Sequence, residues 1–311
     1  MKNKDSTIKI CLACDNNYAK HAGVVIASIL HNATEEDSLA FYILDDEIKK
    51  NNITALESLK KIKNCEINFI KIDKSLFDDY KKVKTHKYVT LATYFRLKLP
   101  SLLPNIDKVI YFDCDFIVNT SLKELYNTDL EGCPIAGVRD IKKKMVLKNP
   151  TYVNAGMLIF DIDKMKELNL ETKFLNWTQI NMPQITCGDQ EIINEVCIGN
   201  IKILDEEWNV QSSNFTNRSS FTKKPKGIHF ISKRKPWNFG SYSYHRNFYF
   251  KYLQLTPWAQ NSWERFLWKD LNQFVSVVKY FFYRPFFLFR PKFYQALYQT
   301  YLKPIKKGNN V

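Results

Sequence analysis

Hydrophobic and polar residues form alternating blocks in the N-terminal part of the chain, and these blocks predict strands. Residues 8–14, IKICLAC, are an apolar run bounded by polar residues, which is typical of a buried strand. Three further apolar runs, at 39–44, 65–72 and 108–112, have similar lengths and boundaries. We therefore expect four strands in this part of the chain.

Helical periodicity appears between the predicted strands. Apolar residues three and four positions apart over 22–30 predict a helix after the first strand. A second helix is expected to begin at Asp45 or Asp46 and to continue to about Lys61, and a third to cover 90–99 and to end at the proline that follows. Strands that alternate with helices predict an α/β fold with a mostly parallel sheet and helices on both faces.

The composition fits one globular domain with an appendage. The chain has 311 residues, of which 45% are hydrophobic, and this is enough to bury one large core or one core plus a small appendage. Its 9 glycines and 11 prolines are too few for a collagenous or long disordered chain. We expect one domain over residues 1–255 and a tail over residues 256–311.

Positive charge is concentrated toward the C-terminus. The formal net charge is +14, and the segment after residue 222 holds 17 of the 46 Lys and Arg residues but only 2 of the 32 Asp and Glu residues. Charge asymmetry of this kind indicates an anionic partner for the basic part of the chain.

Aromatic residues are interleaved with the basic ones between Trp258 and Tyr301. Rings and cations together suit a bilayer interface, where rings lie at headgroup depth and cations contact anionic lipid. Binding to nucleic acid is a second interpretation, and a helix packed on the main domain is a third. We favour a helical tail on an anionic inner-membrane surface and expect no nucleic acid. Lys279 and Arg284 interrupt the apolar run, so the tail is not expected to span the membrane.

The sequence predicts a protein that stays in the cytoplasm, peripheral on the membrane's inner face. Asp5 and Lys9 interrupt the apolar run that a signal peptide requires. The seven cysteines are an odd number, which favours reduced thiols. Cys11 and Cys14 form a CxxC pair, but no second pair and no His at zinc spacing accompany it, so we interpret both as buried strand residues.

Acidic residues follow the predicted strands, at the edge where open parallel sheets bind ligands. The strongest local signal is YFDCDFIVN, 111–119, in which Asp113 and Asp115 come directly after an apolar strand. Period-two alternation points both carboxylates to one side, where they repel each other unless a cation lies between them. Oxygen ligands at a strand tip suit Mg²⁺ or Mn²⁺, with a substrate's phosphates completing the coordination. A solvated loop is the alternative interpretation.

An apolar strand followed by Asp-x-Asp also opens phosphatases of the haloacid dehalogenase type, in which the first Asp is the nucleophile. Those enzymes usually continue with Gly-Thr and carry the motif near the N-terminus. Here Phe116 and Ile117 follow, deep in the chain, and no convincing Lys and acidic-pair motifs come after them. A phosphatase is therefore kept only as an alternative.

Six motifs occur in order over residues 8–240. They are CLACDNNYAKHAGVVIASIL (11–30), TLATYFRLKLPSLLP (90–104), DKVIYFDCDFIVNTSLKELYNTDLEG (107–132), YVNAGMLIFDIDKM (152–165), CGDQEIINE (187–195) and IHFISKRKPWN (228–238). In sequence and spacing they resemble glycosyltransferase family 8, the group that includes bacterial lipopolysaccharide galactosyl- and glucosyltransferases. The resemblance implies a single Rossmann-like catalytic domain of the GT-A type over residues 1–255.

The resemblance also implies a site for a metal and a nucleotide-sugar. Asp113, Asp115 and His229 would hold Mn²⁺, or Mg²⁺, against the diphosphate of UDP-galactose or UDP-glucose. The expected nucleotide-binding residues, at positions that match the motifs, are Asp15, Asn17, Tyr18, Asp113, Cys114 and Lys235. The Cys114 side chain is expected to point into the core. Family members have a glycine three positions after the His, where this chain has Ser232, and this puts one backbone contact to phosphate in doubt.

Four further residues are implied to surround the transferred sugar: Arg96, Asn154, Asp189 and Gln190. Structural interpretations remain open, since Arg96 also suits an ion pair and Asn154 a turn. Asp189 suits a helix N-cap, and we expect it to be both the cap and a sugar ligand. The family retains anomeric configuration, and Gln190 is a poor nucleophile. We therefore expect same-face attack by the acceptor.

The resemblance implies a lipopolysaccharide or lipooligosaccharide core as the acceptor, a glycolipid that the basic tail would help to reach. Three other classes stay open: a phosphatase, a membrane adaptor with an inactive glycosyltransferase fold, and a family member that uses another acceptor, as galactinol- and glycogenin-type enzymes do. No motif selects galactose over glucose.

Overall fold

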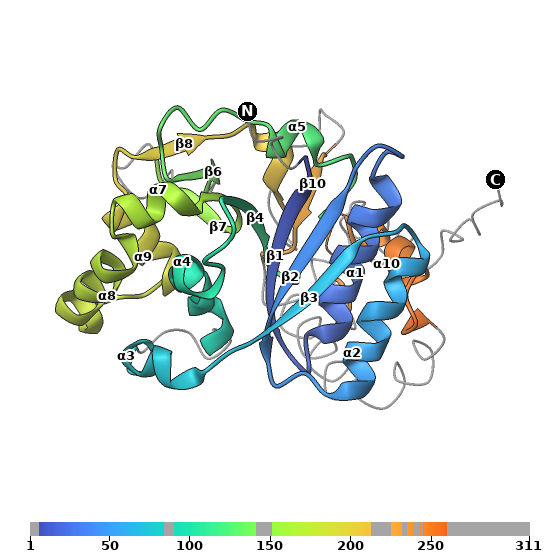
Figure 1. The fold of residues 1–311 in the computed structure, drawn as a ribbon, viewed down its shortest axis with the longest axis horizontal. Coiled ribbons are helices and arrows are strands. Elements are labelled where there is room, and N and C mark those ends of the chain that lie inside the picture. The colour runs from blue at the N-terminus through green and yellow to red at the C-terminus, as the bar shows by residue number, and fades with distance from the viewer. Residues whose placement is uncertain are drawn as a thin grey trace, which may run out of the picture.

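The computed structural model describes residues 6–83, 90–140, 151–212, 225–231, 235–238, 243 and 245–259. A seven-stranded sheet lies at the centre of this part of the chain (Figure 1). In spatial order its strands are β3 (Glu66–Lys71), β2 (Leu39–Asp46), β1 (Ile8–Asp15), β4 (Lys108–Phe112), β7 (Val153–Asp161), β6 (Ile135–Arg139) and β8 (Ile201–Ile203). A second, three-stranded sheet has the order β5 (Phe116–Val118), β10 (Gly227–His229) and β9 (Val210–Gln211).

The large sheet is mostly parallel, as the alternation of strands and helices predicts. Strand β1 pairs in parallel with β2 and β4, β2 with β3, and β6 with β8. Strand β7 is the exception, because it runs antiparallel to both β4 and β6. Its reversed direction brings the start of β7 to the edge at which β1 and β4 end.

Helices cover both faces of the large sheet (Figure 1). One face carries α1 (Ala19–Asn32) and α2 (Lys50–Glu57), with α10 (Arg246–Leu253) packed against α1. The elements on the other side are the 3₁₀ helix η3 (Leu91–Lys98), α4 (Leu99–Leu102), α7 (Ile162–Glu167), α8 (Leu170–Asn181) and α9 (Asp189–Val196). The shorter segments are η1 (Ser58–Lys61), η2 (Lys74–Phe77), α3 (Asp78–Lys81), α5 (Lys123–Tyr126), η4 (Met182–Gln184) and η5 (Glu206–Asn209).

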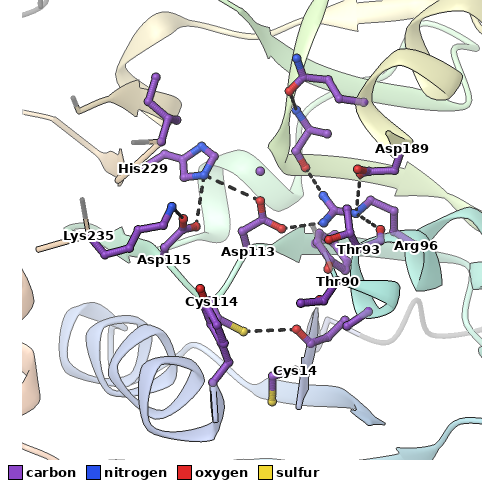
Figure 2. Close-up of a pocket in the computed structure, with 18 of the residues that line it drawn as sticks. Cys14, Thr90, Thr93, Arg96, Asp113, Cys114, Asp115, Asp189, His229 and Lys235 are labelled. Carbon is purple, nitrogen blue, oxygen red and sulfur yellow. Dashed lines mark hydrogen bonds and ion pairs between the residues drawn. The ribbon is translucent and has the colours of Figure 1, made fainter. Parts of the chain in front are cut away.

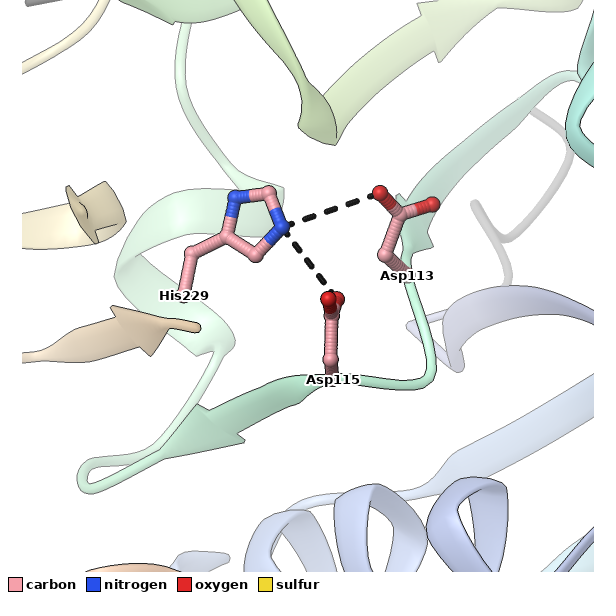
Figure 3. A group of neighbouring side chains, drawn as sticks. All are labelled: Asp113, Asp115 and His229. Carbon is pink, nitrogen blue, oxygen red and sulfur yellow. Dashed lines mark ion pairs between the residues drawn. The ribbon is translucent and has the colours of Figure 1, made fainter. Parts of the chain in front are cut away.

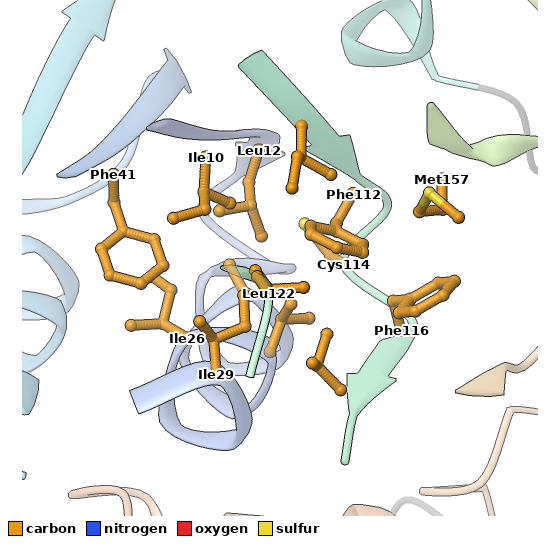
Figure 4. Close-up of a cluster of buried hydrophobic side chains, with 14 of the residues drawn as sticks. Ile10, Leu12, Ile26, Ile29, Phe41, Phe112, Cys114, Phe116, Leu122 and Met157 are labelled. Carbon is orange, nitrogen blue, oxygen red and sulfur yellow. The ribbon is translucent and has the colours of Figure 1, made fainter. Parts of the chain in front are cut away.

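Strand β1 shows why the apolar runs are continuous. Ile10 and Leu12 pack into the cluster under α1, whereas Cys11 and Ala13 pack into the cluster under η3 and α9. Successive side chains of a strand point to opposite faces, so a strand covered on both faces carries apolar residues on both. Lys9, near the start of β1, pairs with Asp107 at 3.1 Å. Figure 4 shows the first of the two clusters, between the sheet and α1. The buried, free thiols of Cys11 and Cys14 agree with their interpretation as strand residues.

Two of the predicted helices have other boundaries in the structure. Strand β2 continues to Asp46, α2 begins only at Lys50, and the last turn is the 3₁₀ helix η1. The segment 90–99 is not one α-helix, because η3 is followed by α4, which contains Pro100 near its start. Proline is tolerated in a first helical turn, where its missing N–H has no partner in any case, so it does not end the helix here.

The first residues of the predicted tail lie on the domain. Thr256 is buried, and the Trp258 ring packs on α1 at Gly23, where a Cβ atom would overlap the ring. The rest of the predicted tail lies outside the described residues. Among the described residues no helix is long and apolar enough to cross a membrane.

Candidate functional site

A cleft of about 660 Å³ opens at the edge of the sheet where β1 and β4 end. Asp15 closes β1 on one side of it, and Asp113 follows β4 directly. The start of β7 adds Asn154, Ala155 and Gly156 on the other side. The cleft thus lies where ligands bind in open α/β sheets.

Three predicted metal ligands meet in this cleft (Figure 3). Asp113 and Asp115 stand on the turn between β4 and β5, and His229 ends β10, which pairs antiparallel with β5. His229 Nε2 lies 3.2 Å from Asp115 Oδ1 and 3.7 Å from Asp113 Oδ2, and the three ligand atoms lie within 4.8 Å of one another. A residue far along the chain therefore completes the group that the Asp-x-Asp motif begins.

The residues fit a divalent cation. Within the described structure, Asp115 Oδ1 is buried and accepts no hydrogen bond. Two carboxylates and one imidazole are hard oxygen and borderline nitrogen donors, which suit Mn²⁺ or Mg²⁺. Burial raises the pKa of Asp115, but its charged surroundings, the Lys235 ammonium first among them, lower it more strongly, so the net pKa lies below its usual range. Asp115 is therefore held as a carboxylate, the form that binds metal.

Gly156 makes room for His229. A Cβ atom at this position would overlap the imidazole ring, which explains why the Asn-Ala-Gly motif has a glycine here. The backbone of Gly156 also accepts a hydrogen bond of 2.8 Å from the N–H of Asp113, which ties the metal-ligand turn to β7.

Lys235 approaches the same group from the C-terminal segment. Its ammonium forms an ion pair with Asp115 Oδ2 and donates to the carbonyl oxygen of Phe230 at 2.7 Å. Trp237, two residues on, stacks on the His21 ring of α1 with a centroid separation of 3.6 Å. The predicted diphosphate ligand thus belongs to a segment that is packed against α1.

Arg96 joins the metal group to the predicted sugar site (Figure 2). Its guanidinium is 2% exposed, lies 2.6 Å from Asp113 Oδ1 and 3.0 Å from Asp189 Oδ2, and stands over the Tyr111 ring. Burial lowers the pKa of Arg96, but the two carboxylates raise it more, so the guanidinium stays charged. The ion-pair interpretation of Arg96 is confirmed, with two acidic partners.

Asp189 starts α9 but does not cap it. The N-cap is Gly188, whose φ of 61° is in the region that glycine adopts without strain, so the predicted N-cap role of Asp189 is wrong. Burial raises the pKa of Asp189 to about 7, although Arg96 opposes this shift. The charge of Asp189 therefore changes with pH near neutrality.

Gln190 and Asn154 are bonded to each other instead of extending freely into the cleft. Gln190 Oε1 accepts from Asn154 Nδ2 at 3.2 Å and from the backbone N–H of Ala155 at 3.1 Å. Gln190 Nε2 donates to Asp140 Oδ2 at 3.2 Å. Asp140 is a partner that the sequence did not indicate.

The predicted nucleotide residues lie at the end of β1. Asp15 Oδ1 accepts the backbone N–H of Tyr18 at 2.9 Å, and both residues line the cleft, whereas Asn17 is outside its lining. Burial, together with nearby acidic groups, raises the pKa of Tyr18 to about 12. The Cys114 thiol donates to the carbonyl oxygen of Ala13 and packs in the core, as predicted.

Sequence reasoning missed three residues around the site. His21 stacks on Trp237, two residues after the predicted Lys235. Asp140 contacts the predicted Gln190, and Asn209 contacts the predicted Asn154. His21 lies inside the first motif, which is the one signal that could have drawn attention to it. Asp140 and Asn209 belong to none of the six motifs.

Known proteins resemble the chain over most of its length. The sequence model described as Glycosyl transferase family 8 matches residues 9–240. General stress protein A of Bacillus subtilis is 27% identical over 82% of this chain and 96% of its own length. The lipopolysaccharide 1,3-galactosyltransferase of Salmonella typhimurium is 26% identical over 80% of this chain and 79% of its own.

The fold also resembles a solved structure. The galactosyltransferase LgtC, in complex with donor and acceptor sugar analogs, superposes with a TM-score of 0.70 at 22% identity, over 80% of this chain and 96% of that one. This likeness confirms the expected GT-A type of fold.

Proposed function

Because the chain belongs to glycosyltransferase family 8, we propose that it is a retaining hexosyltransferase that moves galactose or glucose from a UDP-sugar to a glycolipid acceptor with the help of Mn²⁺. One observation carries the proposal. Asp113, Asp115 and His229 converge in a cleft, and Arg96 links that group to Asp189 at the start of α9. A metal group beside a buried Arg–Asp ion pair supports transfer from a nucleotide-sugar, whose diphosphate binds a divalent ion.

The departing UDP carries the negative charge that builds up as the sugar–phosphate bond breaks. A divalent ion on Asp113, Asp115 and His229 would offset this charge as a Lewis acid. Lys235, whose ammonium reaches the same carboxylate group, is proposed to add a point charge next to the diphosphate. Asp15, Asn17 and Tyr18, at the end of β1, are proposed to bind the uracil and ribose.

The sugar is proposed to lie against Arg96, Asn154, Asp189 and Gln190. Asp189 is paired with Arg96, and the Gln190 amide is a weak nucleophile that is already hydrogen-bonded. We therefore favour attack by the acceptor on the face that UDP leaves, with the departing phosphate taking the acceptor's proton. Mass spectrometric detection of a glycosyl–Asp189 adduct would contradict this mechanism.

A lipopolysaccharide or lipooligosaccharide core is the acceptor that we propose. The support comes from relatives named as lipopolysaccharide glycosyltransferases and from the basic, aromatic sequence after residue 259. We propose that this sequence holds the enzyme on the inner face of the cytoplasmic membrane. A variant that ends at Ala259, which keeps Trp258 on α1, is expected to lose binding to anionic vesicles; a variant that still binds would assign the tail a structural role.

The proposal is tested by UDP release from a panel of UDP-sugars, with Mn²⁺ and then with EDTA. Hydrolysis of UDP-galactose or UDP-glucose that disappears with EDTA and in Asp113→Asn would support it and would name the donor. Asp163→Asn, which changes an exposed carboxylate that pairs with Lys166 of its own helix, is the matched control and should behave as the wild type.

Two other outcomes lead to other functions. Release of phosphate from small phosphoesters without any UDP-sugar would favour the phosphatase alternative. Failure to release UDP from any sugar, with lipooligosaccharide present, would favour a membrane adaptor on an inactive glycosyltransferase fold.

A further inference from the structure

Asn209 lies outside the cleft, but a hydrogen bond to Asn154 links it to one of the predicted metal ligands, His229. It ends η5, immediately before β9, and its side chain is 1% exposed. Its Nδ2 donates to Asn154 Oδ1 at 3.0 Å, and Asn154 Oδ1 lies 2.9 Å from His229 Nδ1. None of the six motifs includes Asn209.

Two partners of unambiguous character fix the orientation of the Asn154 amide. The backbone N–H of Gly156, which can only donate, points at Oδ1 from 3.1 Å. On the other side, Nδ2 lies 3.3 Å from a carboxylate oxygen of Asp140, which accepts when ionised. The atom that faces His229 is therefore the amide oxygen.

The proton of His229 follows from this orientation. Because Asn154 Oδ1 only accepts, the ring nitrogen that it faces, Nδ1, carries a hydrogen and donates it. Nε2 is left directed at Asp113 and Asp115. A histidine metal ligand needs this arrangement, with one nitrogen free for the ion and the other held by a hydrogen-bond acceptor.

Asn209 supplies the third donor to the same oxygen. Three donors around Asn154 Oδ1 oppose rotation of the amide, because a rotated amide would place NH₂ against Gly156 N–H and against Asn209. It would also present a donor to His229 Nδ1 and so favour a proton on Nε2, where the metal has to bind.

We propose that Asn209 is a positioning residue that, through Asn154, keeps the proton of His229 on Nδ1 and Nε2 available to a divalent ion. The inference rests on the proposed function only for the presence of the metal site. It concerns the enzyme before any sugar binds, and Asn209 does not line the cleft.

The test combines a spectroscopic signature with metal affinity, both without donor sugar. Long-range ¹H–¹⁵N spectra of the histidine rings, assigned with His229→Gln, report which nitrogen carries the proton. We expect a Nδ1–H signature for His229 in the wild type, and loss of it in Asn209→Asp, which sets a carboxylate against Asn154 Oδ1. Mn²⁺ binding should weaken by about 10-fold or more in Asn209→Asp and Asn209→Leu.

The matched control is Asn32→Leu. Asn32 also donates through its Nδ2, to Ser28 O, Val118 O and Tyr252 Oη, but lies away from the cleft. This variant should lose thermal stability and keep its Mn²⁺ affinity within about 2-fold, well short of the loss expected for a disturbed metal ligand.

A wild-type spectrum with the proton on Nε2 would overturn the inference, and this measurement does not depend on any variant that fails to fold. Unchanged Mn²⁺ affinity and an unchanged His229 signature in folded Asn209→Leu and Asn209→Asp would overturn it as well. A wild type that binds Mn²⁺ in this manner but releases no UDP would refute the proposed function and leave the inference standing.

Discussion

At the scale of single residues, Gly156 leaves no room for a side chain beside His229. Replacement by Ala would push a methyl group into the His229 ring, and either β7 or the ring has to move. Since the ring is a metal ligand, we expect Gly156→Ala to weaken Mn²⁺ binding by at least about 10-fold, as measured by calorimetric titration.

A double variant separates this steric effect from a general loss of structure. Gly156→Ala should also lower the free energy of unfolding by about 1–3 kcal/mol, the usual cost of an overpacked site. In a His229→Ala background the ring is absent, so the same substitution should cost far less. Equal costs in the two backgrounds would show that the clash with His229 is not the cause.

Single residues also show which site contacts a sequence can predict. Asp113, Asp115 and His229 were identified through motifs, and the structure brings them together. Asn209 could not be identified, because a buried asparagine next to a tryptophan has no spacing that indicates its partner. Its partner, Asn154, lies 55 positions earlier, and only the fold brings the two together.

At the scale of elements, His21 holds α1, the segment 235–238 and α10 together. Its ring stacks on Trp237, and Nδ1 lies 2.7 Å from the Tyr249 hydroxyl. Burial lowers the pKa of His21 to about 3, so the ring is neutral in the folded protein. The packing of the segment that carries Lys235 therefore depends on a neutral imidazole.

This packing predicts a pH dependence of stability. The unfolded chain, in which a histidine titrates near pH 6.5, takes up a proton that folded His21 refuses until about pH 3. The folded-state pKa is lowered, so stability is lost as the pH falls below about 6.5, by up to about 1.4 kcal/mol per pH unit from this residue. Urea unfolding of the wild type and of His21→Phe at pH 7, 5.5 and 4.5 measures this dependence. The free energy of unfolding should fall less steeply with decreasing pH in the variant.

His31, at the exposed end of α1, supplies the comparison. His31→Gln should change the pH dependence of the free energy of unfolding much less than His21→Phe does, because the His31 ring is exposed in the folded protein. Identical slopes in the wild type and His21→Phe would contradict a neutral, buried His21.

Among the elements, strands were easier to predict than helices. The apolar runs located β1 to β4 within one or two residues, because strands of a sheet covered on both faces carry apolar residues on both. The helix predicted over 90–99 is a 3₁₀ helix that continues into α4. Its side chains pack in the core, Arg96 included, so tertiary contacts decided its geometry, and these leave no period in the sequence.

At the scale of the whole molecule, the metal group joins the two sheets. Asp113 follows β4 of the large sheet, whereas Asp115 directly precedes β5 and His229 ends β10, which are paired strands of the small one. An ion held by all three residues should therefore stabilise the fold as a unit. At a free Mn²⁺ concentration 100-fold above Kd, the gain in the free energy of unfolding should be about 2.7 kcal/mol.

Calorimetric melting with and without Mn²⁺ measures this gain. Asp113→Asn should melt at the same temperature in both conditions, and Asp163→Asn should respond as the wild type does. An Mn²⁺-dependent shift that survives in Asp113→Asn would place the ion elsewhere.

The pairing of β5 with β10 has a consequence during synthesis of the chain. His229 is translated 114 positions after Asp115, which at about 5–20 residues per second is a delay of about 6–23 s. For that interval the ribosome-bound chain possesses both aspartates but lacks the strand that places the imidazole beside them. A nascent chain can therefore form most of its large sheet before it can bind a metal ion with all three ligands. A ribosome stalled before β10 should carry an intermediate in which this sheet is formed but the metal site is incomplete.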